Sequence, residues 1–312
     1  MFSEKIFTLQ GRRVYQRYEA LTGFRARISP SRVNRCTDSE PAPAKSFETC
    51  QFCPERVFNE TPVFEDGMRI AVGESVTFPN LYPFAEKHVV TVITREHSPL
   101  KFTEKQVRDA LKAQYLALAK CKGYPSINWN NLTSSGASMV HPHMQGISDS
   151  SPTYVTETYL KKSIEYIEKT NGNYWDKVRE CEKNSERYLF GDSIIWSASP
   201  VPMGEKEVRG YMDISSISEF PECINEVASG IIKITDFYRS FGHYAYNMAI
   251  RFDKDNSDGS FQAFVSLIAR INPCSFGSSD SAFMERLHFE PVVMTVPEDL
   301  GEYYRNEFSG KV

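Results

Sequence analysis

The segment His141-Pro142-His143-Met144-Gln145 is the most informative part of this chain, and it holds two of the six histidines. On an extended strand, residues two apart point to the same face, so two imidazoles and an amide would form one row. An imidazole can attack phosphorus and hold the phosphoryl group covalently. A primary amide can donate to oxygens on which charge develops. The row indicates phosphoryl-transfer chemistry, although a bare His-x-His pair also occurs as ordinary core or surface residues.

The run before this segment consists of small polar residues, Asn130-Asn131-Leu132-Thr133-Ser134-Ser135-Gly136-Ala137-Ser138. Gly136 lets the backbone come close to a ligand, and Ser138 supplies a hydroxyl. Such a run is suited to the approach of a phosphate group. It therefore favours the catalytic interpretation of the two histidines.

A second motif is Cys50-Gln51-Phe52-Cys53, followed by Pro54. Cys-x-x-Cys is typical of half a zinc site, of a redox pair or of two buried thiols. A redox pair is expected at the start of a helix that follows a strand. Here the motif follows the polar, proline-containing run SEPAPAKSFET at 39–49. These surroundings favour a metal or structural role.

Zinc would need two further ligands, and the candidates are the six histidines His88, His97, His141, His143, His243 and His288. His97 closes an apolar, strand-like run at 88–94. A set of Cys50, Cys53, His97 and His141 would be tetrahedral and complete. A complete shell leaves no position for water, so the Zn²⁺ would be structural. It would fix His141 and thereby aim His143.

These motifs, in this order, resemble the galactose-1-phosphate uridylyltransferase family, a branch of the histidine-triad superfamily that includes nucleotide-sugar phosphorylases. The family pattern is Cys-x-x-Cys, a strand that ends in His, Asn…Gly-Ala-Ser, and His-Pro-His-x-Gln. Ile28-Ser29-Pro30-Ser31-Arg32-Val33-Asn34-Arg35 looks like the family's Arg-x-x-Arg segment, and Phe78-Pro79-Asn80-Leu81-Tyr82-Pro83-Phe84 looks like its nucleotide-side run. One departure is Leu132, where the family often has Gly.

The resemblance implies an α+β fold in which two histidine-triad-like repeats share an antiparallel sheet flanked by helices. It implies that His143 is the nucleophile, assisted by Gln145. The substrate-binding residues that it implies are Arg32 and Arg35 for phosphates, Gln145 and Ser138 for the α-phosphate, Asn80 and Asn130 on the nucleotide side, and Glu285, near the end of the chain, for sugar hydroxyls.

The expected activity is nucleotidyl transfer from a nucleoside-diphosphate sugar through a covalent nucleotidyl-histidine. A sugar 1-phosphate as acceptor would make the protein a uridylyltransferase-like enzyme, and orthophosphate would make it a phosphorylase of a nucleotide sugar or dinucleotide. A further alternative is a nucleotide-binding homologue without activity. The family also implies a homodimer that shares its sites.

Composition limits the remaining classes. The net charge of −4 argues against a nucleic-acid surface. No apolar run approaches the roughly 18 residues of a membrane span. The start of the chain has no secretory apolar region, and seven cysteines without a tight framework favour a reducing cytoplasm. The 312 residues suffice for two halves, 1–150 with the zinc and active site and 151–312 as a degenerate second half.

An internal duplication supports the two halves. Ala85-Glu86-Lys87-His88-Val89 is echoed by Gly204-Glu205-Lys206-Glu207-Val208, and Ile127-Asn128-Trp129-Asn130 is matched at the same spacing by Tyr246-Asn247-Met248-Ala249. Thr103 with Gln106 predicts a capping box that begins a helix, whose counterpart is expected at 220–240. Another amphipathic helix is expected at 153–169. The second half has Phe261-Gln262-Ala263-Phe264-Val265-Ser266 where the first has His-x-His, so no second metal is expected there.

Overall fold

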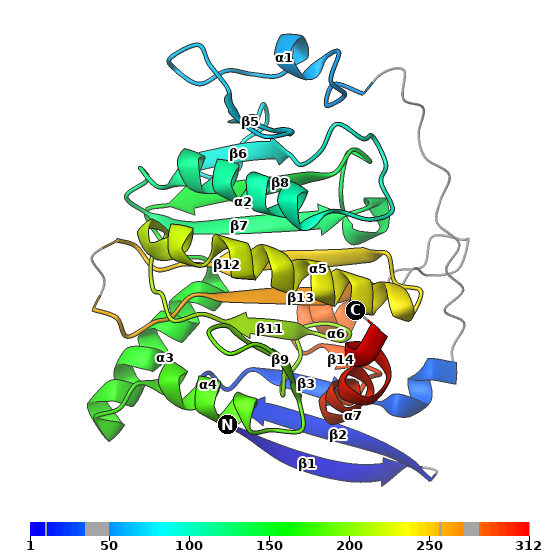
Figure 1. Ribbon diagram of the computed structural model, residues 1–312. Coiled ribbons are helices and arrows are strands. Elements are labelled where there is room, and N and C mark those ends of the chain that lie inside the picture. Colours follow the sequence, from blue (N-terminus) through cyan, green and yellow to red (C-terminus); the bar gives the residue numbers. More distant parts are fainter. Residues whose placement is uncertain (10, 35–49, 256–257, 271–280, 312) are drawn as a thin grey trace.

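A ten-stranded antiparallel sheet forms the centre of the computed structural model, which describes residues 1–9, 11–34, 50–255, 258–270 and 281–311 (Figure 1). From one edge to the other, the strands are β4 (Ile70–Val72), β5 (Ser75–Pro79), β6 (Lys87–Val92), β8 (His143–Asp149), β7 (Tyr124–Asn131), β12 (Ala245–Arg251), β13 (Phe264–Arg270), β11 (Val208–Tyr211), β10 (Ile195–Ala198) and β9 (Tyr188–Phe190).

The two repeats meet in the middle of this sheet. β7 pairs with β12 in antiparallel register, with Asn130 opposite Asn247. On either side of that pair the order is mirrored, because β8, β6, β5 and β4 correspond to β13, β11, β10 and β9. The shared antiparallel sheet that the resemblance implies is therefore confirmed.

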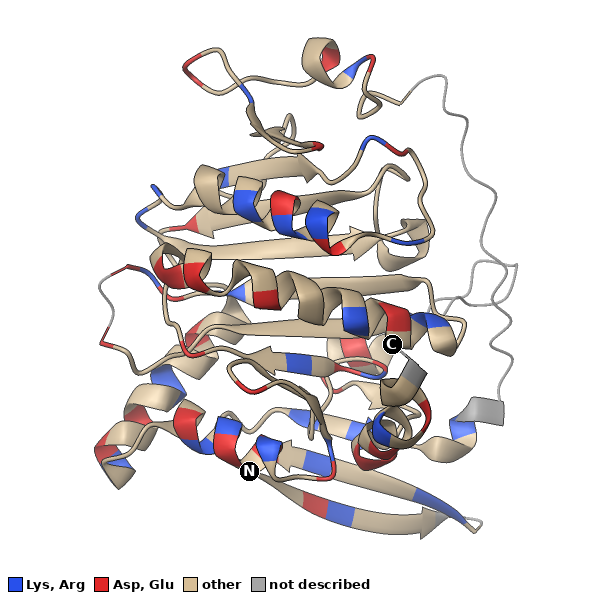
Figure 2. Cartoon of the chain, viewed as in Figure 1, with Lys and Arg blue, Asp and Glu red and all other residues tan. Residues whose placement is uncertain are grey.

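Two long helices cover one face of the sheet, α2 (Glu104–Leu118) and α5 (Ile224–Ser240). The predicted capping box is present at the start of α2, where Thr103 and Gln106 satisfy each other's backbone N–H groups. Both helices bury apolar side chains in one continuous core with the sheet, in which Met144 and Trp129 are fully buried. In Figure 2, acidic and basic residues are interspersed along the outer faces of these helices.

The start of α5 differs from the prediction of a helix over 220–240. Residues Ile217–Glu222 form a separate 3-10 helix, η4, and α5 begins only at Ile224. Pro221 has no N–H to donate, and its ring disfavours the α conformation for the residue before it. The break itself falls at Cys223, whose φ of −121° and ψ of 2° separate η4 from α5.

Two further helices, α3 (Tyr154–Thr170) and α4 (Tyr174–Lys183), pack against the opposite face of the sheet in the second half. α3 matches the predicted amphipathic helix to within one residue at each end. Tyr159 and Trp175 from these helices pack their rings against Phe264 of β13. The same face of the first half carries no such helix among the described residues.

A second, four-stranded sheet joins the two ends of the chain. It consists of β1 (Phe2–Leu9), β2 (Arg12–Glu19), β3 (Arg25–Ile28) and β14 (Val292–Val293), in that order, with β14 parallel to β3. The first 28 residues are thus held by the C-terminal segment rather than by the strands of the first repeat.

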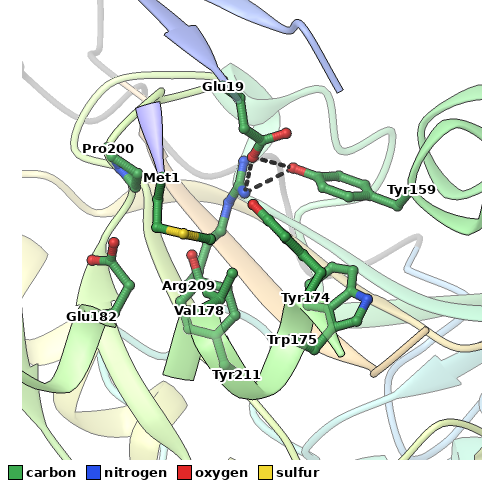
Figure 3. A pocket seen from close by; sticks show the side chains of 10 residues that line it. All are labelled: Met1, Glu19, Tyr159, Tyr174, Trp175, Val178, Glu182, Pro200, Arg209 and Tyr211. Atoms are coloured by element: carbon green, nitrogen blue, oxygen red, sulfur yellow. Dashed lines mark hydrogen bonds and ion pairs between the residues drawn. The ribbon is translucent and has the colours of Figure 1, made fainter. Parts of the chain in front are cut away.

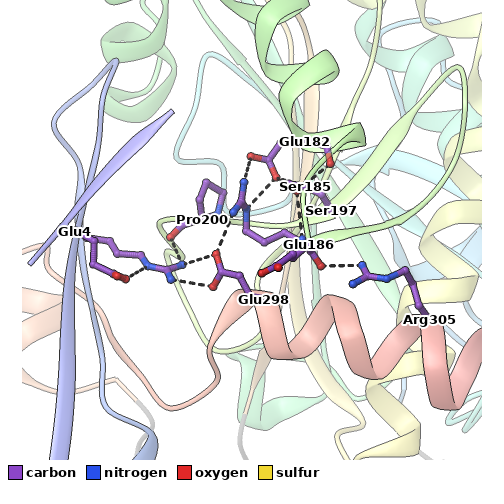
Figure 4. Close-up of polar contacts among 10 residues, drawn as sticks. Glu4, Glu182, Ser185, Glu186, Ser197, Pro200, Glu298 and Arg305 are labelled. Carbon is purple, nitrogen blue, oxygen red and sulfur yellow. Dashed lines mark hydrogen bonds and ion pairs between the residues drawn. The ribbon is translucent and has the colours of Figure 1, made fainter. Parts of the chain in front are cut away.

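An ion-pair network fastens this second sheet to the rest of the molecule (Figure 4). Arg17 of β2 is 4% exposed and pairs with Glu4 and with Glu298 of α7 (Pro297–Tyr303). Glu298 also pairs with Arg187, which in turn binds Glu182 of α4. Because such mutually satisfied charges are costly to separate once buried, the network ties three distant parts of the sequence together.

The remaining elements are short: α1 (Val57–Glu60), α6 (Phe283–Leu287), the 3-10 helices η1 (Pro30–Asn34), η3 (Thr133–Ser135) and η6 (Ser309–Lys311), and a π-helical turn, η5 (Tyr304–Phe308). Among the described residues, none of the helices has the length and apolar character needed to cross a membrane.

Candidate active site and metal centre

β8 carries the two residues expected to perform the chemistry. Met144 points into the core beneath α2 and α5, so His143 and Gln145 lie on the opposite face of the sheet, as strand alternation requires. His143 is 4% exposed. α2 and α5 thus support the strand from one side, and His143 and Gln145 lie on the other.

The four predicted metal ligands converge in one cluster. The ligand atoms of Cys50, Cys53, His97 and His141 all lie within 4.8 Å of one another. Cys53 Sγ is 3.4 Å from Nδ1 of His97 and 3.7 Å from Nδ1 of His141, and Cys50 Sγ is 3.7 Å from the same atom of His141. A tetrahedral zinc ion with ordinary Zn–S and Zn–N bonds would separate such atoms by about 3.6 Å. The residues therefore fit a metal of this kind.

The surroundings of the cluster support that fit. Nε2–H of His141 donates to the carbonyl oxygen of Thr94 (2.8 Å), which leaves the Nδ1 lone pair facing the thiols. Burial, with His97 and His143 close by, lowers the pKa of His141 to about 4, so this ring is neutral. Burial and the adjacent Cys50 raise the pKa of Cys53 to about 11. Two thiolates at this place need a bound cation.

Phe52 connects the cluster to His143, and no pattern in the sequence singled it out. Its ring meets His143 edge to face at 5.4 Å between centroids and contacts Phe78 at 5.6 Å. Since Phe52 stands between Cys50 and Cys53, anything that fixes the two cysteines also fixes this ring. The cluster is thereby coupled to the orientation of His143.

The hydrogen bonding of His143 determines which nitrogen can react. Nδ1 lies 2.9 Å from the carbonyl oxygen of His141. A carbonyl only accepts, so Nδ1 carries the proton and Nε2 keeps its lone pair. Burial lowers the pKa of His143, against the opposing effect of that hydrogen bond. The ring is therefore neutral, and Nε2 is the nitrogen that keeps a free lone pair.

Gln145 and Asn80 lie around a further histidine, His88 of β6. Oε1 of Gln145 is 2.8 Å from Nε2 of His88, and Nδ2 of Asn80 is 3.0 Å from the same nitrogen. Gln145 and Asn80 are distant in sequence, and the pairing of β6 with β8 and β5 brings them together. His88 entered the sequence analysis only as one of six possible zinc ligands.

The loop between β7 and β8 has the tight backbone that the small residues predict. Gly136 has a φ of +95°, and a Cβ at this residue would lie 4.0 Å from Nδ2 of Asn130. Ser138 is exposed on the same loop. Leu132 has a φ of +69° and a ψ of 159°, a region that is ordinarily restricted to glycine. Leu132, the residue at which the sequence departs from the family pattern, therefore also carries backbone strain.

The second repeat contributes to this loop. Asn247 Nδ2 donates to Oδ1 of Asn130 (2.6 Å) and to the carbonyl oxygen of Ser135 (2.8 Å). Nη1 of Arg270 donates to Oδ1 of Asn247 (2.9 Å). No pattern in the sequence pointed to Asn247 or Arg270, because their contacts with this loop depend on the pairing of β7 with β12.

Three predicted binding residues are not joined to this group by any described contact. Arg32 lies exposed in η1 after the second sheet. Both carboxylate oxygens of Glu285 accept backbone N–H groups, from Ala282 (2.8 Å) and Val292 (3.0 Å). Arg35 lies outside the described residues. Their assignment to the substrate remains a prediction.

In the second half, the face equivalent to the site is closed. Glu19, Tyr159 and Arg209 form a buried hydrogen-bonded group there (Figure 3). The cavity beside them, about 10 Å³, is also lined by Tyr174 and Tyr211 and has room for one water molecule. Aromatic and paired charged side chains fill this part of the second half.

Comparison with known proteins identifies one relative by sequence and several by structure. No family model matches the chain. An uncharacterized protein of Archaeoglobus fulgidus is 31% identical over 276 residues, which cover 83% of this chain and 82% of that protein.

Solved structures share the architecture at low sequence identity. One is an ADP-glucose phosphorylase from Arabidopsis thaliana with bound ADP-glucose, which matches with a TM-score of 0.73 at 16% sequence identity. The match covers 94% of this chain and 99% of the phosphorylase chain. Another is a uridylyltransferase, which matches with a TM-score of 0.69 at 16% sequence identity. That match covers 95% of this chain and 99% of the uridylyltransferase chain. The chain thus belongs to one family with the Archaeoglobus fulgidus protein, and it shares its fold with the ADP-glucose phosphorylase and the uridylyltransferase.

Proposed function

We propose that this chain is a nucleotidyltransferase that takes the nucleotidyl group of a nucleoside-diphosphate sugar onto His143 and passes it to a phosphate acceptor. The observation that carries the proposal is the state of His143, which is buried, neutral, and protonated at Nδ1 by its bond to the carbonyl of His141. Its Nε2 therefore keeps a lone pair, on the face of the sheet opposite α2 and α5. The fold shared with an ADP-glucose phosphorylase and a uridylyltransferase supports the class of substrate.

In the first half-reaction, Nε2 of His143 attacks the α-phosphorus in line. An N–P bond forms, the P–O bond to the sugar phosphate breaks, and the sugar phosphate leaves with the electron pair. The ring becomes cationic, and the carbonyl of His141 stabilises the proton that stays on Nδ1. The amide of Gln145 donates to the phosphoryl oxygens, where charge builds up.

In the second half-reaction, an oxygen of the acceptor phosphate attacks the same phosphorus and His143 leaves as a neutral imidazole. Asn80 and Asn130 are placed on the nucleotide side, and Gly136 and Ser138 would approach the phosphates. The acceptor is a sugar 1-phosphate in a uridylyltransferase-like enzyme and orthophosphate in a phosphorylase. Both acceptors use the same covalent intermediate.

We propose Zn²⁺ as the occupant of the Cys50, Cys53, His97 and His141 cluster. When bound, the ion supplies the positive charge that keeps two thiolates in a buried place. The four residues then hold the 50–53 segment against β8, with Phe52 on the ring of His143. A closed set of four ligands has a structural role.

The first test offers UDP-, ADP-, GDP- and CDP-sugars one at a time and records the intact mass of the protein without acid. A nucleotidyl adduct on the wild-type protein that is absent from His143→Ala is expected, whereas His243→Ala, a control outside the site, should keep it. Addition of orthophosphate or a sugar 1-phosphate to the isolated adduct then identifies the acceptor. Binding without any adduct would refute the transferase and favour a nucleotide-binding homologue.

The shared sites of the family also imply a homodimer, which we propose for this chain. Light scattering coupled to size-exclusion chromatography measures the mass in solution. A monomeric mass at the concentrations at which the enzyme is active would refute the dimer.

A further inference from the structure

His88 lies between the nucleotide-side residues and the amide of Gln145. It is 5% exposed and stands at the start of β6, opposite Ile147 of β8. The backbone N–H of Phe84 points at its Nδ1 (3.4 Å), and the Phe84 ring meets the imidazole at 4.2 Å between centroids. On the other side, Nε2 is 2.8 Å from Oε1 of Gln145.

These contacts select one tautomer of His88. The N–H of Phe84 can only donate, so Nδ1 accepts and is unprotonated. The proton of the neutral ring is therefore on Nε2, from which it is donated to Oε1 of Gln145. The nearby Nδ2 of Asn80 cannot accept this proton, and Asn80 cannot be turned around because its Oδ1 accepts the N–H of Tyr82 (2.9 Å). The bond from His88 to Gln145 pairs Nε2–H with Oε1 and leaves Nδ1 for the N–H of Phe84, while the NH₂ group of Asn80 lies beside Nε2 as a second donor and is not paired there.

The bond determines which end of the Gln145 amide faces the ligand. A primary amide is nearly symmetric in shape, and without a partner either end could face the phosphate. With Oε1 bound to His88, the NH₂ group is directed away from His88 and its two N–H donors are left for anionic oxygens. The reversed amide would present a carbonyl oxygen to the phosphate and repel it.

We propose that His88 is a positioning residue for nucleotidyl transfer, which holds the amide of Gln145 with its NH₂ group toward the transferred phosphoryl group. The inference rests on the proposed function. The same imidazole accepts the N–H of Phe84, so it also links the 80–84 segment on the nucleotide side to the amide of Gln145. Loss of His88 should lower the rate of nucleotidyl transfer from every nucleotide sugar, because His88 acts through Gln145 and does not contact the base.

The test is a double-mutant cycle on the single-turnover rate at which His143 becomes nucleotidylated. Gln145→Ala should lower this rate about 100-fold, the loss typical of one oxyanion donor. His88→Leu should lower it about 10-fold or more with little change in donor KM. The double variant should be no slower than Gln145→Ala, because both changes remove the same interaction.

Two variants control for a merely structural role. His88→Gln keeps a side-chain N–H near the position of Nε2 and should recover most of the rate. His243→Leu removes a half-buried imidazole elsewhere and should leave the rate unchanged. Losses that multiply in the double variant, or a His88→Leu protein as fast as the wild type, would overturn the positioning role.

A second measurement does not depend on activity. Long-range ¹H–¹⁵N correlation spectra of the wild-type protein report which ring nitrogen of each histidine is protonated, and His88 should be the Nε2–H tautomer. An Nδ1–H tautomer would overturn the bond to Gln145 even in an active enzyme. Absence of any adduct on the wild-type protein would instead overturn the proposed function, and the role in transfer with it.

Discussion

Replacement of Leu132 should reverse the usual stability order of glycine and alanine. Leu132 has a φ of +69° and a ψ of 159°, and it is held there because its carbonyl oxygen accepts the N–H groups of Ser135 (3.1 Å) and Ala137 (3.3 Å). A residue with a Cβ in this region carries about 1–3 kcal/mol of strain. Leu132→Ala keeps that strain, and Leu132→Gly removes it. Both variants lose the same side chain, so their difference isolates the backbone.

The expected difference follows from two opposing terms. At an ordinary position Gly is less stable than Ala by about 0.4–1 kcal/mol, because the unfolded chain gains freedom. Relief of about 1–3 kcal/mol of strain acts in the other direction. Leu132→Gly should therefore be more stable than Leu132→Ala by about 1 kcal/mol, or a Tm difference of about 1.5 °C for a chain of this size.

The assay is urea unfolding of the metal-saturated proteins, followed by fluorescence, with thermal scans as a second reading. Leu100 provides the matched control pair, because it is 72% exposed and its φ is not in the positive region. Leu100→Gly should be less stable than Leu100→Ala by about 0.4–1 kcal/mol. If the Leu132 pair shows the same order and size as the Leu100 pair, the strain argument is wrong.

Three further changes test other parts of the structure. Cys53→Ser should lose most of the bound zinc and lower Tm, because a closed site contributes to folding; full zinc content by atomic spectroscopy with an unchanged Tm would remove Cys53 from the ligand set. Glu298→Gln should cost about 2 kcal/mol at pH 7, since its carboxylate accepts charged hydrogen bonds from Arg17 and Arg187. Burial alone would raise the pKa of Glu298, but the two guanidinium groups lower it below 4.5. The difference in free energy of unfolding between the wild type and Glu298→Gln should therefore persist above pH 4.5 and shrink as the pH falls further. A difference that does not depend on pH in urea unfolding would contradict this. Gly230→Ala should cost about 1–3 kcal/mol, because a Cβ there would lie 2.2 Å from the indole of Trp196, and an unchanged unfolding midpoint would show that the indole moves freely.

The elements that carry local patterns were predictable from the sequence. The capping box of Thr103 and Gln106 begins α2 where expected, because capping depends on residues three apart. The duplication predicted two similar halves, whereas the mirrored strand order, with β7 beside β12, was visible only in the structure. The start of α5 was placed too early, because the apolar spacing continues through Pro221 while the backbone cannot.

The candidate site divides in the same way. The residue types of the His-Pro-His-x-Gln segment and the spacing of Cys50 and Cys53 indicated the chemistry and the metal class, since strand alternation and ligand chemistry are local properties. The roles of Phe52 and Asn247 became visible only in the structure, because they depend on which strands pair and on which loops fold over them. A hydrogen bond such as that from His88 to Gln145 joins residues 57 positions apart, and its existence is determined by tertiary packing, which no local sequence pattern encodes.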